Sequence, residues 1–144
     1  EFQTYIKNVL ANAKMLAETL KNNGFKIYSG GTDTHLMLVD LRPFSVKGNL
    51  ASESLSRANI TCNKNGIPFD TEKPMITSGI RLGSQAATTR GFGLKEFEKV
   101  GELITKVIKG LSENPEDNSK VENEVRNEVV SLCSNFPIYK NLNK

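Results

Sequence analysis

One arginine lies among small residues that would let a ligand approach it closely. Arg81 belongs to the segment 77–84, in which Thr, Ser and Gly predominate. A guanidinium presents a rigid fork of donors that matches a carboxylate in a bidentate manner. The segment therefore predicts a receptor for a small carboxylate at Arg81. The alternative is a surface or interface salt bridge, because most arginines are solvated.

Three other positions are candidates for binding or chemistry, and each has a structural alternative. Asn65 lies in a polar stretch before Pro68, where its amide offers a donor and an acceptor to a ligand or forms a turn. His35 and Asp33 could form an acid–base pair or a structural hydrogen bond. Arg90, beside a glycine, is expected to brace the segment that follows Arg81.

Several kinds of catalytic and binding site have no support in the sequence. There is no Gly-x-Gly-x-x-Gly run, Walker loop or Gly-x-Ser-x-Gly elbow, and a single histidine leaves no ligand set for a metal. Cys62 and Cys133 are expected to be free thiols in a reducing compartment. A net charge of +3 does not favour a nucleic-acid partner, and no apolar run of about 18 residues predicts a membrane span. We therefore expect no self-contained enzyme.

The 144 residues predict one domain in which a small sheet is layered with helices, an α/β arrangement of the α+β kind. Apolar residues at helical spacing predict helices over residues 2–22, 94–111 and 119–136. Short apolar runs predict strands over 25–28, 36–39, 60–62 and 79–82. Residues 63–74, rich in Asn, Gly and Pro, predict a long loop.

Two helix starts are predicted from capping residues. Asn49 is expected to cap a helix that continues through Arg57. Ser119 and Glu122 have the spacing of a capping box, in which each side chain bonds the other residue's backbone N–H.

Several short blocks of the sequence form a pattern that is more specific than any one motif. These blocks are Ser29-Gly30-Gly31-Thr32-Asp33, His35-Leu36, Val39-Asp40-Leu41, Ala58-Asn59-Ile60-Thr61, Asn63-Lys64-Asn65, Ile67-Pro68, Thr77-Ser78-Gly79-Ile80-Arg81 and Thr88-Thr89-Arg90-Gly91-Phe92. In their order and spacing they resemble the end of serine hydroxymethyltransferases, over residues 2–139. The run Ser84-Gln85-Ala86 departs from the usual Thr-Pro-Ala of that family.

The resemblance implies the carboxyl-terminal small domain of an aspartate-aminotransferase-type (fold type I) pyridoxal-phosphate enzyme. That family interconverts serine and glycine and passes the one-carbon unit to tetrahydrofolate. Its cofactor lysine lies in a Thr-Thr-Thr-His-Lys-like segment, which this sequence lacks. We therefore expect no catalytic and no cofactor-binding residue here. Because residue 1 is Glu rather than Met, we expect a chain that begins partway through a longer protein, although trimming or processing would give the same start.

By the same resemblance, Arg81 matches the arginine that holds the amino-acid carboxylate, and Asn65 matches an asparagine that contacts the folate. The implied partners are glycine or serine, tetrahydrofolate, the chain's own large domain and a second subunit of a cytoplasmic homodimer. A standalone carboxylate-binding module and a dimer-interface domain are the alternatives. Whether the chain folds alone, and whether the parent is a dimer or a tetramer, are left open.

Overall fold

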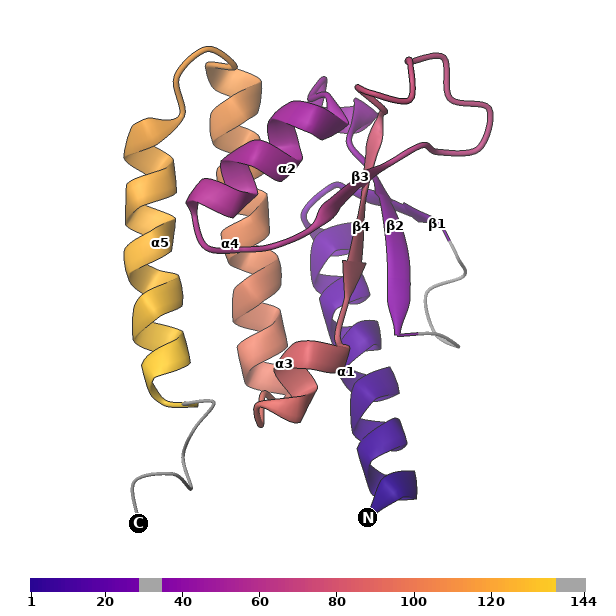
Figure 1. The fold of residues 1–144 in the computed structure, drawn as a ribbon, viewed down its shortest axis with the longest axis vertical. Coiled ribbons are helices and arrows are strands. Elements are labelled where there is room, and N and C mark those ends of the chain that lie inside the picture. Colours follow the sequence, from indigo (N-terminus) through magenta and orange to yellow (C-terminus); the bar gives the residue numbers. More distant parts are fainter. Residues whose placement is uncertain (29–34, 137–144) are drawn as a thin grey trace.

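The computed structural model describes residues 1–28 and 35–136 and shows a four-stranded sheet beside a group of helices (Figure 1). This arrangement confirms the predicted α+β class. The helices are α1 (Phe2–Asn22), α2 (Gly48–Arg57), α3 (Gln85–Thr89), α4 (Leu94–Glu113) and α5 (Ser119–Ser134), with a 3₁₀ turn η1 (Arg42–Phe44). The strands are β1 (Lys26–Tyr28), β2 (Leu36–Asp40), β3 (Asn63–Asn65) and β4 (Gly79–Gly83).

The sheet has the order β1-β2-β4-β3, and every neighbouring pair of strands is antiparallel. Arg81, at the centre of β4, is opposite Leu38 of β2 on one side and Asn63 of β3 on the other. Successive side chains of a strand point to opposite faces. The register therefore decides which side chains lie beside Arg81.

One face of the sheet is buried against the helices. Val39 and Ile80 are opposite each other on that face and are fully buried. In Figure 1, α5, α4 and α1 run side by side, and the buried apolar residues of α1 and α4 belong to one hydrophobic core. The helical spacing of α1 confirms its prediction, since Ala13, Leu16 and Leu20 are all buried. The opposite face of the sheet, which we call the open face, is covered by none of the helices of residues 1–28 and 35–136 (Figure 1).

Helix α2 joins the sheet to the helical layer. Its first backbone N–H groups bond the chain just before β4, because Gly48 N lies 3.0 Å from Thr77 O and Asn49 N lies 2.9 Å from Ile76 O. At the other end of α2, Arg57 reaches α5. Helix α2 thus connects the start of the strand that carries Arg81 to the far side of the domain.

The predicted cap at Asn49 is wrong. Lys47 is the N-cap of α2 and makes no side-chain cap bond. Asn49 lies inside the first turn, and its Oδ1 is buried with no hydrogen-bond partner among the described residues. Because the start of α2 packs closely on residues 76–79, the helix has its N-cap two residues earlier than the capping preference of asparagine predicts.

The predicted strand over residues 60–62 is also wrong, because the strand β3 occupies Asn63–Asn65 instead. A three-residue polar strand has no apolar pattern, and only its pairing with β4 defines it. The predicted loop over residues 63–74 accordingly begins with a strand. The short helix α3 was not predicted, although residues 94–111 do form the core of α4.

The capping box predicted for Ser119 and Glu122 is wrong as well. The N-cap of α5 is Asn118, and Glu122 is only 4% exposed. Its carboxylate accepts hydrogen bonds from Ser54 and from Arg57, whose Nε and Nη2 each lie 2.9 Å from an oxygen. A buried carboxylate needs charged partners more than a backbone donor at a helix end. Glu122 therefore fastens α5 to α2.

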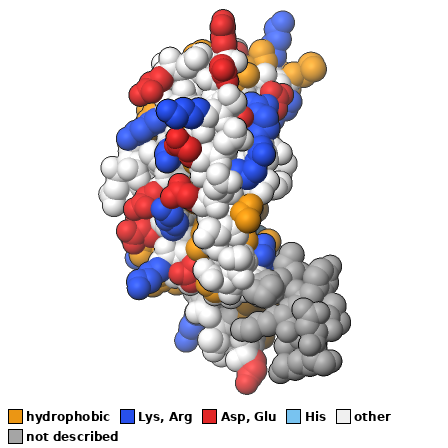
Figure 2. Space-filling model, turned by 90° about the vertical axis from the view of Figure 1, so that its left-hand side faces the viewer, with side chains coloured by type: hydrophobic (Ala, Val, Ile, Leu, Met, Phe, Trp, Pro, Cys, Tyr) orange, Lys and Arg blue, Asp and Glu red, His pale blue; other side chains and the backbone are white. Residues whose placement is uncertain are grey.

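Figure 2 shows the side of the molecule that carries α5, where acidic and basic side chains alternate over the surface. Lys106 lies 3.3 Å from Glu124, and Lys99 lies 3.1 Å from Glu128. Among the described residues, no helix is both long and apolar enough to cross a membrane.

Candidate ligand-binding face of the sheet

Arg81 lies on the open face of the sheet. Its neighbours Ile80 and Leu82 point into the core, so alternation along β4 directs the guanidinium the other way, and the side chain is exposed. Among the described residues, the side chain of Arg81 makes no hydrogen bond or ion pair, and only its backbone is paired, with β2 and β3. A guanidinium on a rigid central strand, without a partner of its own, is available to an anionic ligand.

Asn65 lies on the same face, one strand away. It is opposite Gly79 in the register, whereas Asn63 is opposite Arg81, so Asn65 and Arg81 are diagonal neighbours. Diagonal neighbours are about 7–8 Å apart, and their Cβ atoms are somewhat closer. The Asn65 amide donates a hydrogen bond to Gly66 O at 2.9 Å, and no described residue donates to its Oδ1. The structure thus brings the two predicted site residues together.

A cavity of about 410 Å³ opens beside Asn65. It lies under the long loop that joins β3 to β4, which projects beyond the sheet in Figure 1. Arg81 is not among the lining residues, so its guanidinium lies outside this cavity. The lining residues are Lys64, Asn65, Gly66, Asp70, Glu72, Pro74 and Thr77.

Asp70 organises this loop. Its carboxylate accepts hydrogen bonds from the backbone N–H groups of Ile67, Glu72 and Ser78 and from the Ser78 hydroxyl, at 2.8–3.2 Å. Partial burial raises the pKa of this carboxyl, but those four hydrogen bonds outweigh it and lower the pKa to about 2. Asp70 therefore stays ionised and joins the two ends of the loop.

Close packing fixes the last residues before β4. Thr77 has a φ of 60°, and its hydroxyl donates to Gly79 O at 3.0 Å. A Cβ on Gly48 would lie 2.6 Å from that same oxygen. Only glycine lets α2 approach the strand so closely. The helix start therefore holds the backbone two residues before Arg81.

A second polar cluster occupies the open face, on the side of β2 away from Asn65. The side chain of Asp40 is 1% exposed and is bonded by Arg42, whose Nη2 lies 2.7 Å from Oδ2. The Tyr28 hydroxyl donates to the same oxygen at 3.1 Å. Burial raises the pKa of Asp40, but the hydrogen bonds from Arg42 and Tyr28 and the charge of Arg42 outweigh it and lower that pKa.

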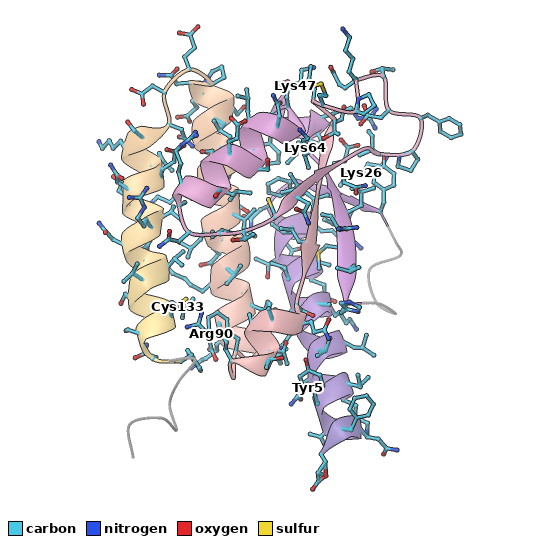
Figure 3. All side chains as sticks on the ribbon, in the orientation of Figure 1. Tyr5, Lys26, Lys47, Lys64, Arg90 and Cys133 are labelled. Carbon is cyan, nitrogen blue, oxygen red and sulfur yellow. The ribbon has the colours of Figure 1, made fainter. Side chains whose placement is uncertain are left out.

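The other predicted candidates take structural positions or lie outside the described residues. Asp33 is not described, so the Asp33–His35 pair is not tested; His35 accepts a hydrogen bond from Ser84 N through its backbone carbonyl, at 3.1 Å. Arg90 donates to Phe136 O from Nε and Nη2, at 3.1 and 2.9 Å. It therefore holds the carboxyl end of α5, beside Cys133 (Figure 3), rather than the segment after Arg81.

The two thiols have different surroundings. Burial alone raises the pKa of Cys62 to about 12, which keeps it protonated and unreactive. Cys133 lies near Arg90 at the other end of the domain. Both are free, as predicted.

Comparison with known proteins identifies the family. The family model described as serine hydroxymethyltransferase matches residues 1–104. The chain belongs to the serine hydroxymethyltransferase family. It is 87% identical over 142 residues to the serine hydroxymethyltransferase of Pelagibacter ubique (strain HTCC1062). This match covers 99% of this chain and 33% of that relative. The serine hydroxymethyltransferase of Marinomonas sp. (strain MWYL1) is 64% identical over 97% of this chain and 33% of its own length.

The chain thus spans about a third of the length of the serine hydroxymethyltransferases it matches. The family resemblance predicted from the sequence is confirmed. Asp70 and the cluster of Asp40, Arg42 and Tyr28 were not among the predicted site residues. An aspartate two residues after a proline, in a polar loop, is typical of a turn-forming carboxylate and would have indicated Asp70.

Proposed function

We propose that this chain is the carboxyl-terminal small domain of a serine hydroxymethyltransferase and that Arg81 binds the carboxylate of glycine or serine. The observation that supports this most is the exposed guanidinium of Arg81, which has no partner among the described residues. Membership of the serine hydroxymethyltransferase family supports glycine or serine as the amino acid that Arg81 binds. A bidentate pair with Arg81 would fix the amino acid's orientation as well as its position.

Asn65 is proposed to contact the folate that receives the one-carbon unit. Its free Oδ1 is an acceptor at the rim of the cavity under the loop 66–78. The ring N–H groups and the amino group of a pterin are donors that such an oxygen would accept. The diagonal placement of Asn65 and Arg81 would hold the two ligands side by side.

The family's cofactor, pyridoxal phosphate, serves as an electron sink when it is bound. The described residues do not fit its covalent attachment to this chain, because no lysine accompanies Arg81 at the centre of the open face. Lys26 lies two strands away, with its ammonium 5.0 Å from the Tyr28 ring centre. We therefore propose that the remaining two thirds of the enzyme hold the cofactor and make the dimer contacts. We also propose that the whole enzyme is cytoplasmic.

A hybrid enzyme tests this proposal. In the hybrid, this chain replaces the matching third of the Pelagibacter ubique relative, to which it is 87% identical. We expect the hybrid to cleave serine to glycine with tetrahydrofolate as acceptor at a rate close to that of the relative. An inactive but folded hybrid, beside an active relative, would overturn the assignment and favour a standalone carboxylate-binding module.

Arg81 is tested in the same hybrid by glycine titration. Hydrogen bonds to charged groups are worth about 1.5–3 kcal/mol, so Arg81→Ala should weaken glycine binding roughly 10- to 100-fold. Arg81→Lys should also weaken it, because the fork of donors is lost. Unchanged glycine affinity in both variants would remove Arg81 from the site.

A further inference from the structure

The carboxylate of Asp40 is a potential competitor for Arg81. Asp40 lies on the open face, where it is opposite Gly79, and Leu38 is opposite Arg81. Asp40 and Arg81 are therefore diagonal neighbours on adjacent strands of the same face. Such residues are about 7–8 Å apart, with their Cβ atoms somewhat closer, which is within reach of a long side chain. An unoccupied carboxylate at this position would pair with Arg81.

The carboxylate of Asp40 already has partners, because Arg42 and Tyr28 donate hydrogen bonds to its two oxygens. Arg42 donates from Nε to Oδ1 and Oδ2 at 3.1 Å each, from Nη2 to Oδ2 at 2.7 Å and from its backbone N–H to Oδ1 at 2.9 Å. Tyr28 adds a fifth hydrogen bond, to Oδ2 at 3.1 Å. The charge of Asp40 is therefore balanced within its own cluster.

The cluster of Asp40, Arg42 and Tyr28 is also stabilised by contacts that do not involve Asp40. Arg42 Nη2 donates to the Tyr28 hydroxyl at 3.2 Å, and Lys26 lies over the ring of Tyr28. Arg42 belongs to η1, which directly follows β2, so a turn of fixed geometry returns its side chain to Asp40. Tyr28 comes from β1 on the far side of β2 from Arg81. Tyr28 thus draws the carboxylate away from β4, and Arg42 holds it beside the end of β2.

We propose that Arg42 is a positioning residue for substrate binding, because it holds the Asp40 carboxylate and so keeps the Arg81 guanidinium free for the carboxylate of the amino acid. The inference rests on the proposed function of Arg81. It explains why a nearly buried acid and an unpaired arginine coexist on neighbouring strands. In this arrangement Arg42 contacts no ligand and acts only through Asp40.

Glycine titration of the hybrid enzyme tests the proposal. In Arg42→Leu, Arg81 is expected to pair with Asp40, and glycine should bind roughly 5- to 30-fold more weakly. Adding Asp40→Asn to that variant removes the competing charge and should return the affinity to within about threefold of the parent hybrid. Arg42→Lys, which keeps a cation beside Asp40 and spares the fold, should stay within about threefold as well. Arg126→Leu, on α5, is the control for loss of a positive charge.

The rescue distinguishes positioning from a purely structural role. If Arg42 only stabilised the fold, the double variant would bind glycine no better than Arg42→Leu, and the proposal would be overturned. Unchanged affinity in Arg42→Leu would show that Lys26 or water satisfies Asp40, which also overturns it. Unchanged affinity in Arg81→Ala would instead defeat the proposed function itself.

Discussion

Asp70 receives two hydrogen bonds from Ser78, one from the backbone N–H to Oδ2 and one from the hydroxyl to Oδ1, each 2.8 Å long. Ser78 directly precedes β4, whereas Asp70 belongs to the loop that follows β3. A single carboxylate therefore sets the distance between the ends of the loop that connects Asn65 to Arg81. The proposed ligand contacts of Asn65 and Arg81 therefore both depend on the hydrogen bonds by which Asp70 closes this loop.

Asp70→Asn should weaken glycine and folate binding together. An amide replaces one acceptor oxygen with a donor that faces the N–H groups of the loop, so the closure loosens at both strands. We expect each dissociation constant to rise roughly 5- to 20-fold in the hybrid enzyme, measured by titration. Asp117→Asn is the matched control, since Asp117 accepts the backbone N–H and the hydroxyl of Ser119, both at Oδ1, in the turn before α5. Loss of affinity for one ligand alone would contradict a shared closure.

Asn65→Ala should affect folate binding but leave glycine binding nearly unchanged. The substitution removes an acceptor at the cavity rim and touches neither Arg81 nor its strand pairing. A weakening of folate binding of roughly 5- to 20-fold is expected from loss of one or two neutral hydrogen bonds. Titration of the hybrid with each ligand separately gives both values. A change seen only with glycine would refute the assignment.

Gly48→Ala should be strongly destabilising. The new Cβ would lie 2.6 Å from Gly79 O and 2.9 Å from Ile76 O, and both are backbone atoms that cannot move aside. Forcing a methyl into a packed site costs about 1–3 kcal/mol. Urea unfolding of the hybrid measures the loss, with Gly66→Ala as control, because a Cβ there meets only an Asp70 oxygen at 3.8 Å. Equal stability of the two variants would show that the α2 contact yields easily.

Glu122 should make stability depend on pH in the acid range. The hydrogen bonds from Arg57 lower the pKa of Glu122, against burial, which raises it. The unfolded chain therefore takes up a proton at higher pH than the folded one. The stabilisation by Glu122 is complete above the ordinary glutamate pKa and is lost as the pH falls through the lowered value.

Thermal unfolding of the hybrid and its Glu122→Gln variant tests this dependence. We expect Glu122→Gln to cost on the order of 1–3 kcal/mol at neutral pH, with the difference shrinking below about pH 4. Glu124→Gln is the control, because Glu124 and Lys106 form an ion pair that is 46% exposed on each side. A difference between parent and Glu122→Gln that stays constant with pH would rule out the ionised pair as its source.

The sequence predicts the long helices and the central strands well and the polar details poorly. α1 and α4 follow from apolar residues at helical spacing, and β2 and β4 from short apolar runs, because burial alone selects those residues. β3 leaves no such signal, since its three residues are polar and are paired only through their backbone. Ser119 and Asn49 mislead for a related reason. Local capping patterns do not reveal that Glu122 binds Arg57 or that α2 packs on residues 76–79.

The candidate site shows the same limit. Arg81 was predicted from its small neighbours, and that neighbourhood is visible in the sequence. The register that sets Asn65 diagonally beside it is a property of the sheet, and nothing local encodes it. The partners of Asp40 and Asp70 are likewise decided by turns and by pairing across strands.

The strands at the two edges of the sheet, β1 and β3, have three residues each, and each carries a lysine, Lys26 or Lys64. Unpaired strand edges invite other chains to add on and start aggregates, and short, positively charged edges resist this addition. The open face can therefore remain accessible to a small ligand while the rims of the sheet discourage polymerisation. The proposed ligand contacts and the protection from aggregation thus lie in different parts of the sheet, its middle and its edges.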